Sequence, residues 1–190
     1  MKAKKTLFLT VFTLMLLVGL VATGVALAAP AGLDVHQPMP VAGAISPPVS
    51  EVYEETYVDW SNPANPMLVR PGNLTYEFYG DLEGTFVESI TMRAPLLTFD
   101  GHYTLEGQAA FVGRLNGMEA SWAGSIVGRG FIDPEYGGAA GWEGCVTTIT
   151  SSASPLSHLR GTIVSTGAWG PTGGSASYSG LLIWDTGKKN

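Results

Sequence analysis

The feature that most constrains the fold of this chain is an alternation of apolar and polar residues that begins near residue 51. Large apolar side chains occupy every second position from Leu74 to Phe78, with Thr75 and Glu77 between them. Because successive side chains of a strand point to opposite faces, this period indicates a half-buried β-strand. The same texture predicts further strands at 52–60, 86–92, 97–99, 102–104, 109–115, 118–131, 142–150, 159–169 and 176–184. No window after residue 50 shows a sustained helical period, so the sequence predicts an all-β protein.

Short turn signals separate these segments. Asp100-Gly101 and Asn116-Gly117 are each typical of a tight hairpin, because glycine tolerates positive φ. About eight strands in roughly 135 residues are compatible with a closed antiparallel barrel or with a sandwich. Several glycines, among them Gly113, Gly128 and Gly161, fall inside predicted strands, which is typical of strongly coiled strands. The pattern therefore favours a single eight-stranded antiparallel β-barrel over the sandwich.

The N-terminus has the layout of a secretory signal. Lysines occupy positions 2, 4 and 5, no charged residue follows until Asp34, and Ala26-Leu27-Ala28 matches a signal-peptidase site. We expect residues 1–28 to be a cleaved signal peptide, which places the mature chain outside the cytoplasm, secreted or in the cell envelope. The alternative is an uncleaved anchor, since the apolar run is about as long as a bilayer is thick.

The predicted domain lies between two other segments. Residues 29–50 contain five prolines, which fix φ and remove backbone donors, so this stretch is predicted to be an extended linker. The barrel domain is then expected to cover residues 51–186, followed by a polar tail at 187–190.

Charge and cysteine content exclude several classes of protein. Removal of residues 1–28 takes away three of the ten basic residues, which leaves seven against 16 acidic residues and a net charge of about −9. A chain this acidic, with its arginines scattered singly, is a poor nucleic-acid binder. Cys145 is the single cysteine and is expected to be a small core residue. After signal cleavage we expect no membrane association.

Three short segments, taken in order, resemble a known family. They are Tyr79–Gly84 (YGDLEG), Phe111–Gly117 (FVGRLNG) and Leu156–Thr162 (LSHLRGT). Together they resemble a bacterial family of uncharacterised domains related to the allene oxide cyclase barrel, over about residues 51–186. The resemblance implies an eight-stranded antiparallel barrel with an apolar interior, and it implies no known reaction.

Glu88 is the candidate catalytic residue. It lies in phase with Phe86, Ile90 and Met92, so the alternation places its carboxyl group on the apolar face, where desolvation raises a carboxyl pKa. Plant allene oxide cyclases look similar in using a buried glutamate to steer a cationic cyclisation, which is a similarity of role and not a motif match. The alternatives are a structural glutamate paired with an arginine or a tyrosine, and a bulge that turns the side chain outward.

The residues expected to line the interior and to contact a ligand share an inward parity with neighbouring small or apolar residues. They are Phe86, Ile90, Met92, Trp122, Tyr178 and Trp184. They fit either a pocket or a solid core, because eight-stranded barrels are readily filled by side chains. Neither a metal site nor a cofactor is predicted, since the spacing of His102 and His158 matches no compact metal motif and no nucleotide-binding motif is present.

Three functions remain open at this point. The first is a barrel that binds a small apolar ligand in its lumen. The second is a cofactor-independent cyclase or isomerase of an unsaturated lipid or polyketide-like substrate, with Glu88 as electrostatic stabiliser or base. The third is a structural cell-surface domain with a solid core. The interior discriminates among them, and a homo-oligomer is compatible with all three.

Overall fold

The computed structural model describes residues 38–133, 139–171 and 173–185, and its elements there are ten β-strands. The predicted signal peptide, the first part of the predicted linker and the polar tail lie outside these residues. Within the described ranges no helix is long and apolar enough to cross a membrane. The strands are β1 (Pro38–Ile45), β2 (Ser50–Tyr53), β3 (Tyr57–Asp59), β4 (Met67–Gly80), β5 (Leu82–Pro95), β6 (His102–Leu115), β7 (Met118–Asp133), β8 (Ala139–Ser152), β9 (Leu159–Gly170) and β10 (Gly173–Trp184).

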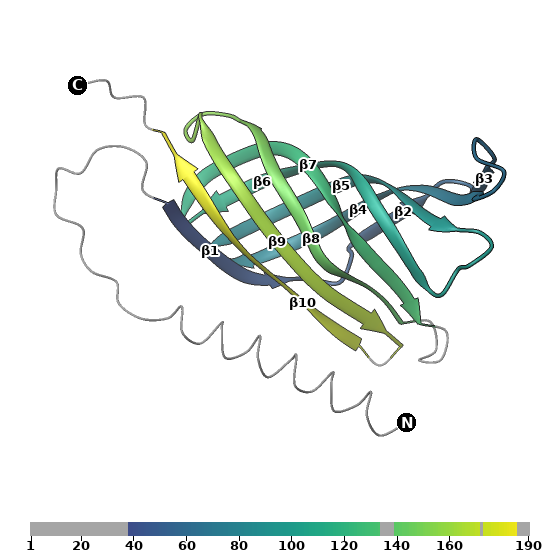
Figure 1. Ribbon diagram of the computed structural model, residues 1–190. Helices are drawn as coiled ribbons and strands as arrows, with labels where there is room; N and C mark the ends of the chain where they lie inside the picture. Colours follow the sequence, from purple (N-terminus) through teal and green to yellow (C-terminus); the bar gives the residue numbers. More distant parts are fainter. Residues whose placement is uncertain (1–37, 134–138, 172, 186–190) are drawn as a thin grey trace, which may run out of the picture. The chain divides into compact units, whose positions relative to one another are not determined.

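Eight of these strands form a closed ring (Figure 1). Strands β4 to β10 pair in sequence order, β10 pairs with β1, and β1 returns to β4, always antiparallel. The closing contact is short, because it joins only Gly43–Ile45 to Phe78–Gly80. Strands β2 and β3 then continue along the same edge of β4, beyond β1. The prediction of an all-β antiparallel fold is confirmed.

Strand β1 corrects the prediction of a linker at 29–50, because Pro38–Ile45 belongs to the ring. The backbone N–H of Ala42 donates to Oδ2 of Asp81 (2.8 Å), which shows that even-numbered N–H groups of β1 point away from β10. Pro38 and Pro40 have the same parity, so the donors that they lack are not needed by the β1–β10 ladder. Proline is tolerated in a strand under this condition. The predicted strand at 52–60 is likewise divided into β2 and β3.

The two predicted hairpins have different outcomes. Asn116 and Gly117 connect β6 directly to β7 with φ values of 49° and 82°, as a two-residue turn with two positive φ angles requires. The prediction of a tight hairpin at Asp100-Gly101 is wrong, because β5 ends at Pro95 and residues 96–101 form a longer loop. The N–H of Leu96 donates to the carbonyl of Pro66 (2.9 Å), so the chain turns toward the β3–β4 connection before it reaches β6.

One part of the ring interior is filled by aromatic side chains. Phe78 stacks on Phe86 and on Tyr178, with ring centroids 4.7 and 4.8 Å apart. Phe111 stacks on Trp122 at 5.6 Å and has no exposed surface. Offset stacking of this kind adds to the free energy of burial, so this part of the ring is a solid core.

Candidate functional site

The structure places Glu88 inside the ring, on the face that the alternation indicated. The side chain is 8% exposed and lies on β5, where it faces Leu74 of β4 and Ala109 of β6 in register. The alternative of a pairing with arginine is not observed, since Arg93 forms its ion pairs with Asp59 and Glu106. Within the described part of the chain, Glu88 has neither a hydrogen bond nor an ion pair. It is therefore a buried carboxyl group without a partner.

Glu88 lines a small cavity of about 30 Å³. A cavity of this size is large enough to hold a water molecule. Strands β2, β4, β5, β6 and β8 each contribute to its wall. The lining residues are Tyr53, Leu74, Tyr76, Glu88, Ile90, Met92, Tyr103, Leu105, Trp142 and Cys145. We call this the Glu88 pocket.

Burial shifts the ionisable groups of the Glu88 pocket toward their uncharged forms. Burial raises the pKa of Glu88 from its ordinary value of 4.5 to about 8. Burial also raises the pKa of Tyr76, and it raises the pKa of Cys145 to about 12. In both cases the nearby charge of Glu88 is the second cause. Tyr103 shifts in the same direction, again chiefly through burial. The pocket thus presents hydrogen-bond donors and apolar surface to any occupant.

An irregularity in β8 brings Trp142 and Cys145 to the same wall, although three positions separate them. The β7–β8 register shifts between Val127 and Arg129, and the β8–β9 register shifts between Trp142 and Cys145. Gly144 supplies the positive φ of 60° within this bulge. A bulge adds one residue to a strand and so reverses the parity after it. Strict alternation therefore does not place Trp142 and Cys145 on one wall, although Cys145 is the core residue that the sequence predicted.

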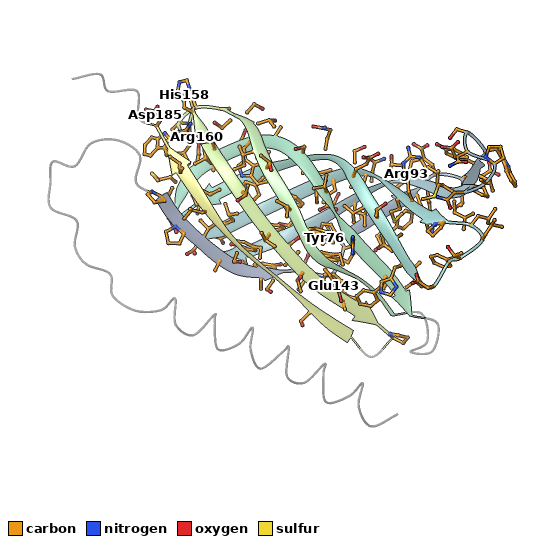
Figure 2. The ribbon with its side chains drawn as sticks, viewed as in Figure 1. Tyr76, Arg93, Glu143, His158, Arg160 and Asp185 are labelled. Atoms are coloured by element: carbon orange, nitrogen blue, oxygen red, sulfur yellow. The ribbon has the colours of Figure 1, made fainter. Side chains whose placement is uncertain are left out.

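Aromatic rings form one side of the pocket. Tyr76, labelled in Figure 2, meets Trp142 edge to face at 5.6 Å, and Trp142 packs against Trp169 at 4.8 Å. The indole Nε1 of Trp142 donates to Oγ of Ser165 (3.0 Å), which fixes the orientation of its ring. This side of the pocket is therefore aromatic, with its rings tilted against one another.

Tyr53 lines the pocket from a strand that is not part of the ring. It ends β2, is half-buried, and faces Gly72 of β4 in register. The guanidinium group of Arg70 lies 4.1 Å from the centroid of its ring. The sequence held no signal for this residue, because the register of β2 on β4 decides which side chain reaches the pocket.

The six predicted ligand-contacting residues are divided between two regions. Ile90 and Met92 line the pocket together with Glu88. The other four lie elsewhere: Phe86, Trp122 and Tyr178 are buried in the solid core, and Trp184 is half-buried at the end of β10.

Other features of the described residues are weaker candidates for a site. A larger hollow of about 450 Å³ lies on the outer face around Arg114, Glu83 and Glu119, but it opens to solvent and its charged side chains are exposed. The described residues contain no group of three or more His, Cys, Asp or Glu side chains that is able to hold a metal ion. His102 contacts Asp100 at the surface (3.3 Å). The buried, partnerless carboxyl group of Glu88 marks the candidate site.

The structure is similar to a solved bacterial protein. A protein of unknown function from the DUF3224 family of Shewanella oneidensis MR-1 aligns with a TM-score of 0.56 and 16% sequence identity, over 78% of this chain and 99% of that chain. The similarity is one of fold. No protein-family model and no curated protein matches the chain.

Proposed function

We propose that this chain binds a small, mainly apolar molecule inside the ring, at the Glu88 pocket. The observation that carries the proposal is the carboxyl group of Glu88, which is 8% exposed, lacks a protein partner and faces a cavity. A buried polar group without a partner costs free energy in the folded state, and such groups concentrate at functional sites. A ligand that hydrogen-bonds to Glu88 recovers this cost.

The finer description of the fold belongs to the same proposal. We propose that the ring is a β-barrel of the allene oxide cyclase-like type and that the mature chain acts after export from the cytoplasm. The three family-like segments and the fold similarity to a bacterial domain of unknown function support the first point. The basic, apolar and small-residue regions of residues 1–28 support the second.

A cofactor-independent cyclase or isomerase is the second candidate function. The pKa of about 8 for Glu88 favours it, because a carboxyl group that titrates near neutral pH is able both to donate and to accept a proton. The third candidate, a structural domain, draws support from the aromatic core alone. That core leaves the partnerless Glu88 unexplained.

Native mass spectrometry of the chain purified from its own host tests the proposal. We expect a bound species of small mass that organic extraction releases. The same preparation of Glu88→Leu, which removes the polar group and keeps an apolar side chain, is expected to retain much less of it. If the wild-type chain is empty and a host lipid extract does not change its thermal midpoint, ligand binding is excluded and the structural function is favoured. A retained molecule that wild type converts and Glu88→Gln does not convert identifies an enzyme.

A further inference from the structure

The Glu88 pocket contains one wall that is not anchored in the ring. Strand β2 has four residues, Ser50–Tyr53, and its backbone pairs only with β4. The other pocket residues lie on strands of the ring, which are paired on both sides. Of the residues that line the pocket, Tyr53 is therefore the one that is able to move with the smallest loss of backbone hydrogen bonds.

The Tyr53 side chain occupies a slot with defined boundaries. Gly72 forms the floor, because its missing side chain allows the ring to approach the β4 backbone. The guanidinium group of Arg70 also lies over the ring, 4.1 Å from the ring centroid. The Tyr53 side chain also lines the cavity beside Glu88. Burial raises the pKa of Tyr53, the charges of Glu51 and Glu88 add to this effect, and Arg70 opposes it.

We propose that the Tyr53 side chain occupies the position of the ligand when no ligand is bound. A neutral, planar ring compound that carries one oxygen substituent displaces Tyr53, takes its place against Gly72 and Arg70, and hydrogen-bonds to Glu88 through its oxygen. This inference rests on the proposed function, because it names the ligand class and the entrance of the same pocket.

Three properties of the pocket specify this class. The cavity of about 30 Å³ is too small for an organic molecule, so a ligand has to take space from a side chain, and Tyr53 is the least anchored one. The slot fits a flat ring, since Arg70 and the walls of Tyr76 and Trp142 favour aromatic contacts. An anion is disfavoured, because burial and next the charge of Glu51 act against a negative charge at the Tyr53 position, and each acts more strongly than the opposing charge of Arg70.

Cys145 provides a reporter that requires no natural ligand. It is the single cysteine, it is 2% exposed, and it lines the same cavity. We expect Tyr53→Ala to increase the rate at which a thiol reagent modifies Cys145 by at least about tenfold, because the cover of the cavity is gone. Added p-cresol, which is the Tyr side chain as a free molecule, is expected to return the rate toward that of wild type. Toluene, which lacks the oxygen, is expected to protect much less.

The matched control is Tyr57→Ala, which removes a tyrosine that is 52% exposed on β3. It is expected to leave the labelling rate unchanged. If Tyr53→Ala does not fold, Tyr53→Leu serves the same comparison, with a smaller increase in rate and the same order of protection by p-cresol and toluene.

Two results overturn the inference. Wild-type labelling rates in a folded Tyr53 variant show that Tyr53 is not the cover. Faster labelling that p-cresol fails to reduce, or that toluene reduces equally, shows that the ligand class is wrong. Neither result affects the search for a bound molecule by native mass spectrometry, so failure of the inference and failure of the proposed function are distinguishable.

Discussion

The ring of Tyr53 lies directly on Gly72, since a Cβ atom at Gly72 would stand 2.6 Å from Cδ1 of Tyr53. The two residues are register partners on β2 and β4. Gly72 is not among the glycines with positive φ, so its backbone conformation suits any residue. The packing of Tyr53 requires the glycine, and if Tyr53 is the cover that we propose, the Glu88 pocket depends on this glycine too.

Replacement of Gly72 by Ala tests this dependence. The added methyl group forces the Tyr53 ring off β4, so we expect Cys145 to react several-fold faster with a thiol reagent. Global stability is expected to stay within about 1 kcal/mol of wild type, because alanine is the better strand residue and offsets part of the lost contact. Urea unfolding measures the stability. Gly117→Ala in the β6–β7 turn is the control: it strains a φ of 82°, meets no neighbour within 4 Å, and should not change the labelling rate.

The inner face of the ring was predictable where the strands are regular. Period-two alternation placed Leu74, Tyr76 and Glu88 inside, because the parity of a regular strand is read directly from the sequence. It does not place Trp142 and Cys145 on one face, and they share one because the bulge at Gly144 reverses the parity. The prediction that Cys145 is a core residue is confirmed, since it is 2% exposed. A glycine inside a strand indicates that a bulge is possible, but the partner strand determines whether one forms.

Strand β1 and Tyr53 escaped prediction for a different reason, which is register. Proline content argues against a strand at 38–45 unless the direction of each N–H is known, and that direction follows from the pairing of β1 with β10. Tyr53 reaches the pocket only because β2 continues along β4 after β1 ends. Both facts depend on residues far apart in the sequence.

Glu88→Gln is expected to change how stability depends on pH. The folded pKa of about 8 lies above the ordinary value of 4.5, so between these pH values the native state binds a proton that the unfolded state has lost. The contribution of Glu88 is fully present below about pH 4.5 and is lost as pH rises through about 8, with a slope of at most about 1.4 kcal/mol per pH unit. Gln resembles the protonated form, and its free energy of unfolding lacks this slope.

The measurement is urea unfolding of both proteins at about pH 5 and about pH 8.5. We expect near-equal stability at the lower pH and a more stable Glu88→Gln at the higher pH. The groups that face Glu88 are Tyr53, Tyr76, Tyr103 and Cys145, whose raised pKa values keep them uncharged in this range. Parallel pH profiles for the two proteins would mean that Glu88 is ionised or solvated in the folded state.

Tyr178→Phe is expected to weaken the closure of the ring. The Tyr178 hydroxyl accepts a hydrogen bond from the N–H of Leu82 (2.7 Å) and contacts the Leu82 carbonyl oxygen (3.2 Å), and Leu82 is fully buried. Loss of the hydroxyl leaves a buried N–H without this partner, which costs about 1–3 kcal/mol. Tyr79→Phe is the control. Tyr79 is an exposed tyrosine near the end of β4, close to Leu82 in the sequence, and the change should alter the free energy of unfolding by less than about 0.5 kcal/mol. Equal effects in the two variants would contradict this assignment.

Arg70→Gln is expected to loosen Tyr53 without removing it. A cation over an aromatic ring at a partly exposed position is worth about 0.5–1 kcal/mol, so Cys145 labelling should rise about two- to fivefold. Arg93→Gln, which breaks surface ion pairs on β5, should leave labelling unchanged. If Tyr53 is the cover, the Cys145 labelling rate falls in the order Tyr53→Ala, Gly72→Ala, Arg70→Gln and wild type, with Tyr53→Ala the fastest. General loosening of the fold would instead rank the variants by their urea midpoints, so an order that follows the midpoints refutes Tyr53 as the cover of the Glu88 pocket.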